Sequence, residues 1–148
     1  MTRPLPIDSD QRANGTSATS LLAARACLAA VFLYSGATKI LFWSAGIAEF
    51  AALGLPMPTL ALTATIAIQI GAGMALLIGW RSKPAALALA AFTVVATLIG
   101  HPFWVFEGGG FQRQLTTALE HLAIVGGLVA IAAAGPGPFS LQPREHSS

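Results

Sequence analysis

The chain has 148 residues, of which 55% are hydrophobic and only 9% charged, and its formal net charge is +2. A soluble domain carries about 25% charged residues, so this chain has too few charges to coat a surface in water. The small net charge is not clustered, so nothing in the sequence indicates a nucleic-acid-binding surface. We therefore expect a protein whose exterior faces a lipid bilayer.

Residues 1–19 are polar and rich in turn-forming residues, and no apolar run lies near the start. Because a cleavable signal peptide needs such a run, the sequence does not predict one. We expect 1–19 to form a disordered tail on the cytoplasmic side, so that the first apolar segment acts as an uncleaved anchor.

Four stretches are long and apolar enough to cross a bilayer as helices. A hydrocarbon core about 30 Å thick needs roughly 20 residues of helix, and only helices or closed barrels satisfy every backbone group in lipid. The stretches lack the alternation of barrel strands, so the sequence predicts an all-α bundle of four transmembrane helices. The predicted helices cover residues 20–43, 58–79, 84–100 and 115–134, within a membrane domain of 20–142 that is followed by a tail of 143–148.

The basic residues predict the orientation of the bundle, because loops rich in lysine and arginine stay in the cytoplasm. The termini and the turn at 81–83 carry most of them, whereas the opposite side has Arg113 and the end-of-helix Lys39. Both termini should therefore be cytoplasmic. The loop at 101–114, rich in glycine and aromatic residues, then lies outside, either as an interfacial anchor or as a flexible lid over a site.

Polar and ionisable side chains within the helices are the candidate functional residues, because such groups are costly inside a membrane. The candidates are Arg25, Lys39, Gln69, His101, Glu120 and His121. Arg25 and Lys39 are separated by roughly 21 Å along one helix, so they lie near opposite faces of the bilayer. By depth, the outer half of the bundle should gather Lys39, His101, Glu120 and His121.

Within this group, the expected neutralising contact is an ion pair between Lys39 and Glu120. The adjacent His121 points about 100° away from Glu120 on the same helix, so the two cannot face one spot. As simpler alternatives, Lys39 and Arg25 snorkel to the headgroups, and Glu120 is only a structural partner. A pocket with a cation, a carboxylate and imidazoles can hydrogen-bond the carbonyls of a quinone or relay protons.

Two kinds of site are not predicted. Cys27 is the only cysteine, and one thiol cannot form an internal disulfide or a redox pair, which argues against a thiol–disulfide enzyme that uses quinone as its oxidant. A metal site is not expected either, because His101 and His121 lie on different elements and His146 lies in the tail.

Four segments of the chain, in the right order, resemble the DoxX family of membrane proteins. The first is an arginine, a Ser-Gly pair and a lysine in the first helix, here Arg25, Ser35, Gly36 and Lys39. The others are a tight basic turn between two helices, a histidine-containing loop, and a last helix with a Gly-Pro-Gly ending, here within residues 67–92, 101–104 and 120–141. One position departs from the family pattern, since Glu120 and His121 stand where a lysine–asparagine pair is common.

The resemblance implies a bacterial inner membrane protein close to quinone or thiol redox chemistry, because the family includes a subunit of a thiosulfate–quinone oxidoreductase. The sequence has no motif for a bound flavin, haem or iron–sulfur cluster, so electrons would come from a partner. We therefore expect an accessory or quinone-interacting subunit of a membrane redox complex rather than a stand-alone enzyme. Its partners would be a redox-enzyme subunit or further copies of this chain in a homo-oligomer.

Two other functions stay open at this point. A small proton-coupled transporter or channel would use Glu120 as its carboxylate, although drug exporters of this size usually place theirs in the first helix. A membrane assembly or scaffold protein would need no catalytic residue at all.

Overall fold

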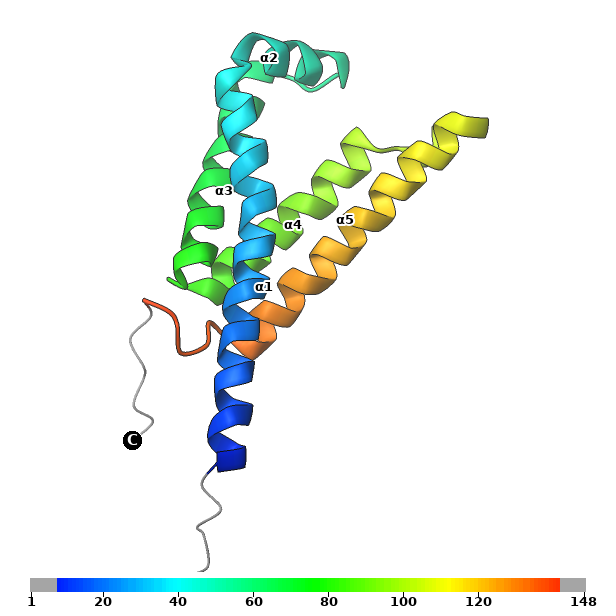
Figure 1. Cartoon of the computed structure of the whole chain (residues 1–148). Helices are drawn as coiled ribbons and strands as arrows, with labels where there is room; N and C mark the ends of the chain where they lie inside the picture. The colour runs from blue at the N-terminus through cyan, green and yellow to red at the C-terminus, as the bar shows by residue number, and fades with distance from the viewer. Residues whose placement is uncertain (1–7, 142–148) are drawn as a thin grey trace, which may run out of the picture.

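The computed structural model describes residues 8–141, with side chains from Ala18 onward. This part of the chain contains helices and no strand, which confirms the all-α class. The elements are α1 (Asp8–Leu41), α2 (Trp43–Ala52), α3 (Pro58–Ile78), α4 (Ser82–Gly100), the 3-10 helix η1 (Phe103–Val105) and α5 (Gly108–Ala134) (Figure 1). Four segments are long and apolar enough to cross a membrane, as predicted: Ala18–Leu41, Pro58–Ile78, Ser82–Val105 and Gly108–Ala134.

The helix boundaries differ from the predicted ones at three places. α1 begins at Asp8 rather than at residue 20, so much of the segment expected to be a disordered tail is helical. No proline lies between residues 7 and 55, and a helix that is already nucleated extends easily until something stops it. α5 begins at Gly108 rather than at 115, and α2 occupies most of the expected 44–57 loop. The short tail predicted at 143–148 lies outside the described residues.

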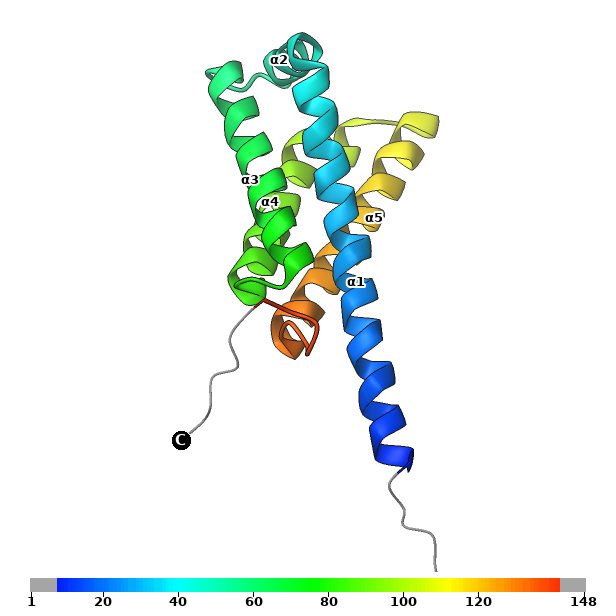
Figure 2. The same ribbon diagram turned by 60° about the vertical axis from the view of Figure 1, so that its left-hand side comes forward.

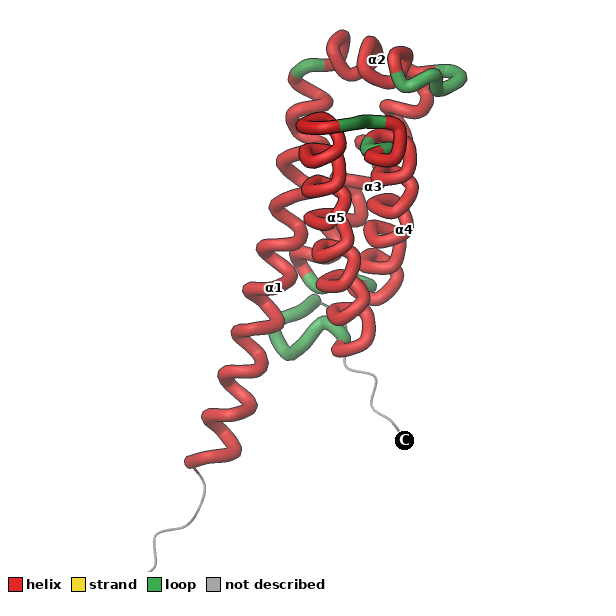
Figure 3. Tube along the Cα trace, turned by 90° about the vertical axis from the view of Figure 1, so that its right-hand side faces the viewer, coloured by secondary structure: helices red, strands yellow, loops and turns green. Residues whose placement is uncertain are grey.

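The transmembrane helices are arranged as two pairs. α1 packs along α3 and α4 packs along α5, while α3 also contacts α4 and α1 contacts α5. The two pairs meet at the end near the C-terminal segment and diverge toward the end that carries α2 (Figures 1 and 2). α2 lies across that end of the bundle (Figure 3).

Small side chains allow the helices to approach closely where the pairs meet. The buried core there is dominated by alanine and leucine, with Ala29, Leu76, Ala85, Ala86, Leu89, Ala90, Leu128 and Ala132 among its members. Between α1 and α3 two glycines serve the same purpose. A Cβ on Gly36 would lie 2.8 Å from Ile70 Cδ1, and one on Gly73 would lie 3.2 Å from Leu33 Cδ2. Small residues at helix contacts are the usual route to tight packing in membranes.

Arg25 ties three segments together at the same end of the bundle. Its side chain is only 1% exposed, so it does not snorkel to the headgroups. The guanidinium donates hydrogen bonds to the carbonyl oxygens of Pro136 and Phe139, and to that of Leu77 at 3.5 Å. The Leu77 carbonyl lies in the last turn of α3, where carbonyl groups lack partners within the helix.

The segment after α5 folds back over the end of α3. Leu141 N–H donates to Ile78 O at 3.1 Å, and a Cβ on Gly79 would lie 2.5 Å from Ser140 Cβ. Gly79 also has a φ of +75°, a conformation that favours glycine. The segment after α5, which includes the Gly-Pro-Gly ending, is therefore in structural contact with α3 and with Arg25 of α1.

We predict that Arg25→Leu lowers the free energy of unfolding by about 3 kcal/mol, because it leaves buried carbonyl groups without their charged donor. Arg25→Lys should recover only part of this loss, since one ammonium cannot span carbonyls on separate segments as a planar guanidinium does. Thermal unfolding of the purified protein in detergent measures both.

The matched control is Arg113→Leu, which removes an exposed arginine from α5 and should change the unfolding temperature little. Equal losses for Arg25→Leu and Arg113→Leu would show that the three carbonyl contacts do not stabilise the bundle.

Candidate functional site

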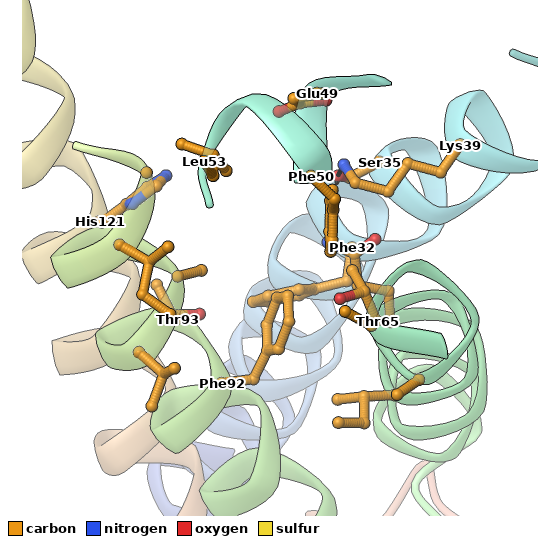
Figure 4. A pocket seen from close by; sticks show the side chains of 18 of the residues that line it. Phe32, Ser35, Lys39, Glu49, Phe50, Leu53, Thr65, Phe92, Thr93 and His121 are labelled. Atoms are coloured by element: carbon orange, nitrogen blue, oxygen red, sulfur yellow. Dashed lines mark hydrogen bonds between the residues drawn. The ribbon is translucent and has the colours of Figure 1, made fainter. Parts of the chain in front are cut away.

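A cavity of about 440 Å³ lies between the two helix pairs at the end that carries α2. All five α-helices contribute to its lining, which is largely apolar. The polar residues that line it are Ser35, Lys39, Glu49, Thr65, Gln69, Thr93, His101 and His121. In Figure 4, Lys39 and Ser35 lie on one side of the cavity and His121 and Thr93 on the other.

The wall formed by α1 and α3 contains a chain of hydrogen bonds centred on Ser35. Ser35 Oγ accepts from Lys39 Nζ at 3.2 Å and from Gln69 Nε2 at 3.1 Å. Ser35 and Lys39 share one face of α1 because they are four residues apart. Gly36 brings α3 close to this face, since a Cβ there would lie 3.3 Å from Gln69 Cβ.

Gln69 is the most deeply buried polar group of this wall. Its side chain is 5% exposed, and no donor within residues 8–141 reaches its Oε1 atom. A buried acceptor without a partner is uncommon in folded proteins. The carboxamide therefore has hydrogen-bonding capacity that the described part of the chain does not use.

The opposite wall is formed by two histidines of α4 and α5, whose rings meet edge to face with centroids 5.1 Å apart. His101 Nδ1 lies 2.8 Å from Gln114 Oε1, and His121 Nδ1 lies 2.7 Å from Thr97 Oγ1. An amide oxygen only accepts, so His101 Nδ1 carries a proton and donates it.

The tautomer of His121 follows from its partner in the same way. Thr97 Oγ1 has one proton and donates it to the carbonyl oxygen of Thr93 at 2.6 Å, so it accepts from His121 Nδ1. Each neutral imidazole keeps its Nε2 atom as an acceptor.

Aromatic side chains occupy the space between the polar walls. Phe32 and Phe92 lie between them, and Phe50 of α2 and Leu53, the residue just after α2, cover the cavity from above in Figure 4. α2 is held against α3 at Gly46, where a Cβ would lie 3.1 Å from Leu62 Cδ1.

The cavity opens toward the lipid. Residues that both line it and are exposed mark its mouth, and within the transmembrane helices those with large side chains are Val31, Ile68, Val95 and Ile99. All four are apolar. One charged lining residue, Glu49, is also exposed, but it lies on α2 outside the membrane spans. A ligand that enters from the hydrocarbon phase meets no charged side chain at this mouth.

Four of the six residues singled out from the sequence surround this cavity: Lys39, Gln69, His101 and His121. Arg25 lies at the other end of the bundle. Glu120 is exposed and is absent from the lining, so the predicted ion pair with Lys39 is wrong. Because His121 points toward the bundle interior, its neighbour in the helix must point away from it.

The sequence interpretation missed several polar residues of the site. Ser35 carries no charge, so a search for ionisable groups passed over it, although its spacing of four from Lys39 is a usable signal. Glu49 could not be found in this way, because the helix that presents it was expected to be a loop. Within residues 8–141, no three side chains of His, Cys, Asp or Glu come together as metal ligands do.

Two curated relatives from Escherichia coli (strain K12) are similar to this chain along most of their length. The inner membrane protein YphA is 27% identical over 84% of this chain and 89% of its own length. The inner membrane protein YqjF is 28% identical over 82% of this chain and 88% of its own. No solved structure gives a significant match. These relatives and the four apolar helices support a multi-pass inner membrane protein.

The family model for DoxX matches residues 20–102, which is more than half of the chain. The match includes Arg25, the Ser35–Gly36 pair and Lys39, on which the resemblance noted from the sequence rests. The chain belongs to the DoxX family.

Proposed function

We propose that this protein binds a quinone in the cavity and serves as a quinone-interacting subunit of a membrane redox complex. The observation that carries the proposal is a cavity with two opposed polar walls, aromatic side chains between them and an apolar mouth within the membrane. A quinone has a flat ring with oxygens on opposite edges and an apolar tail. The aromatic side chains suit the ring, the two polar walls suit the oxygens, and the apolar mouth suits the tail.

The residues of the two walls suggest how the head group would be held. Lys39 Nζ has three protons and donates one to Ser35, so two remain for an oxygen of the ligand. His101 and His121 stand at the opposite wall, where an imidazole ring nitrogen can hydrogen-bond the other oxygen of the ligand. The isoprenoid tail would leave between Ile68 and Val95. In this proposal, electrons come from a partner subunit.

The transporter alternative has weaker support. It assigned a proton-coupled role to Glu120, whose side chain is exposed and does not line the cavity. A scaffold function makes no use of the cavity, and no observation favours it specifically.

We predict that Lys39→Met weakens the binding of decylubiquinone roughly tenfold or more, because a hydrogen bond to a charged donor contributes about 1.5–3 kcal/mol. Equilibrium binding to the purified protein in lipid nanodiscs measures the change. Glu120→Gln serves as the control and should leave the affinity unaltered.

The Glu120→Gln control also distinguishes a quinone site in the cavity from a function that depends on Glu120. If Glu120→Gln abolished binding while Lys39→Met did not, the cavity would not be the quinone site. If the wild-type protein failed to bind the probe in either redox state, the proposed function would be wrong.

We also propose that both termini face the cytoplasm, so that the cavity lies in the outer half of the bilayer. The C-terminal segment and the α3–α4 turn lie at the same end of the bundle (Figure 1). Arg81 lies in that turn, and Lys83 lies in the first turn of α4. Basic residues of short loops are retained on the cytoplasmic side.

Reporter fusions at the C-terminus test this orientation. We expect a green fluorescent protein fusion to fluoresce and an alkaline phosphatase fusion to be inactive, because each reporter works on one side of the inner membrane only. The opposite pair of results would place the cavity in the inner half.

A further inference from the structure

Glu120 is an ionisable side chain that faces outward from a membrane-spanning helix. It lies near the middle of α5, within the span Gly108–Ala134, and its side chain is exposed. It does not line the cavity. Ionisable residues of transmembrane helices almost always face the bundle interior or pair with one another, so an outward carboxylate needs a partner from outside this chain.

The contacts between α4 and α5 give the depth of Glu120. His101, the residue that follows α4, has its Nδ1 atom 2.8 Å from Gln114 Oε1 on α5, so Gln114 marks the level at which α4 ends. Glu120 is six residues further along α5, which is roughly 9 Å deeper. Ala134, at the other end of α5, is roughly 21 Å beyond Glu120. Glu120 therefore lies inside a hydrocarbon layer about 30 Å thick.

The described part of the chain does not compensate this carboxylate. Within residues 18–141 it forms no hydrogen bond and no ion pair. The titratable side chain next to it is His121, which bonds Thr97 of α4 instead. α5 also diverges from α1 toward the α2 end (Figures 1 and 2), so this stretch of α5 is open to the lipid.

The exposed surface around Glu120 suits a second helix. Thr116 and Ala123 lie one turn away from Glu120 on either side, and both are exposed. Gly126 is exposed as well, and a Cβ there would meet no atom within 4 Å, so packing inside the described chain does not require a glycine. Small residues let a neighbouring transmembrane helix approach closely, and a donor on that helix could reach the carboxylate.

A second copy of the chain does not supply the missing positive charge. Copies that insert in the same orientation present the same residues at the same depth, and no exposed cation of the described chain lies at the depth of Glu120. Arg113 is seven residues away on α5, roughly 10 Å nearer the start of the helix. Arg81 and Lys83 lie at the other end of the bundle, and Lys39 lines the cavity.

We infer that this face of α5 binds a transmembrane helix of a partner subunit, and that a lysine or arginine of that helix pairs with Glu120. Such a pair neutralises both charges away from water, as is usual for ionisable residues inside membranes. The inference rests on the proposed redox complex, which needs a partner subunit, and names the surface that this subunit contacts. It does not require quinone binding, because Glu120 lies outside the cavity.

The experiment uses the full-length protein in phosphatidylcholine liposomes, with a synthetic transmembrane helix as the probe. The probe is a helix of leucine and alanine of about 22 residues, with one lysine roughly 9 Å from one end, the depth of Glu120. Energy transfer between a donor dye at the C-terminus of the protein and an acceptor dye on the probe measures binding. We expect this probe to bind about tenfold more tightly than one with leucine in place of the lysine, because it adds a hydrogen bond between charged groups.

Variants of the protein identify Glu120 as the source of this preference. Glu120→Leu should bind the two probes equally, whereas Glu120→Asp keeps the charge and should retain part of the preference. The matched control is Glu107→Leu, which removes an exposed carboxylate just before α5, outside the spans, and should retain the full preference. Because Glu120 forms no hydrogen bond or ion pair within residues 18–141, Glu120→Leu should not lower the unfolding temperature, so a loss of binding is not a loss of the fold.

Three results would overturn the inference. Equal affinity of the two probes for the wild-type protein would show that Glu120 faces lipid without a charged partner. A preference that survives in Glu120→Leu would place the contact with the cation elsewhere. Energy transfer between two differently labelled copies of the protein, lost in Glu120→Leu, would assign this face to a homo-oligomer. The assay contains no quinone, so these results leave the cavity untouched, and a failure to bind decylubiquinone would not affect this face of α5.

Discussion

A polar group inside a bilayer has no water to bond with, so it must find its partner in the protein or in a ligand. This constraint explains both ends of the bundle. At the end with the C-terminal segment, the Arg25 guanidinium binds backbone carbonyls of Leu77, Pro136 and Phe139. At the α2 end, Lys39 and Gln69 both donate to Ser35, and the buried Gln69 Oε1 has no donor among the described residues.

The two ends differ in the size of the side chains between the helix pairs. Alanines such as Ala86 and Ala90 are buried where the pairs meet, and small side chains allow backbones to approach. Phe32, Phe50 and Phe92 occupy the diverging end and leave the cavity beside them. One end therefore holds the bundle together, while the other is open enough to accept a ligand. The backbone carbonyls around Arg25 and the polar walls of the cavity both provide hydrogen-bond partners for polar groups that water does not reach.

The sequence predicted the parts of this structure that depend on local composition. The four membrane spans follow from hydropathy, and the depth of Lys39, His101 and His121 follows from the rise of a helix. The rotation of a helix about its axis depends on packing, which is why the predicted ion pair between Glu120 and Lys39 was wrong. The ten residues of α2 are too few for a test based on membrane thickness. The function of Arg25 needed the path of the chain after α5, which no pattern in the first helix reveals.

The carbonyl contacts of Arg25 have a consequence for biosynthesis. Pro136 follows Arg25 by 111 positions, which corresponds to on the order of ten seconds of translation. Until then, a cation in the first inserted helix lacks its acceptors and must stay near the headgroups, where its long side chain can reach water. The contacts of Arg25 with Pro136 and Phe139 therefore form only after the ribosome has made the segment that follows α5, so closure of this end of the bundle is a late step of biosynthesis.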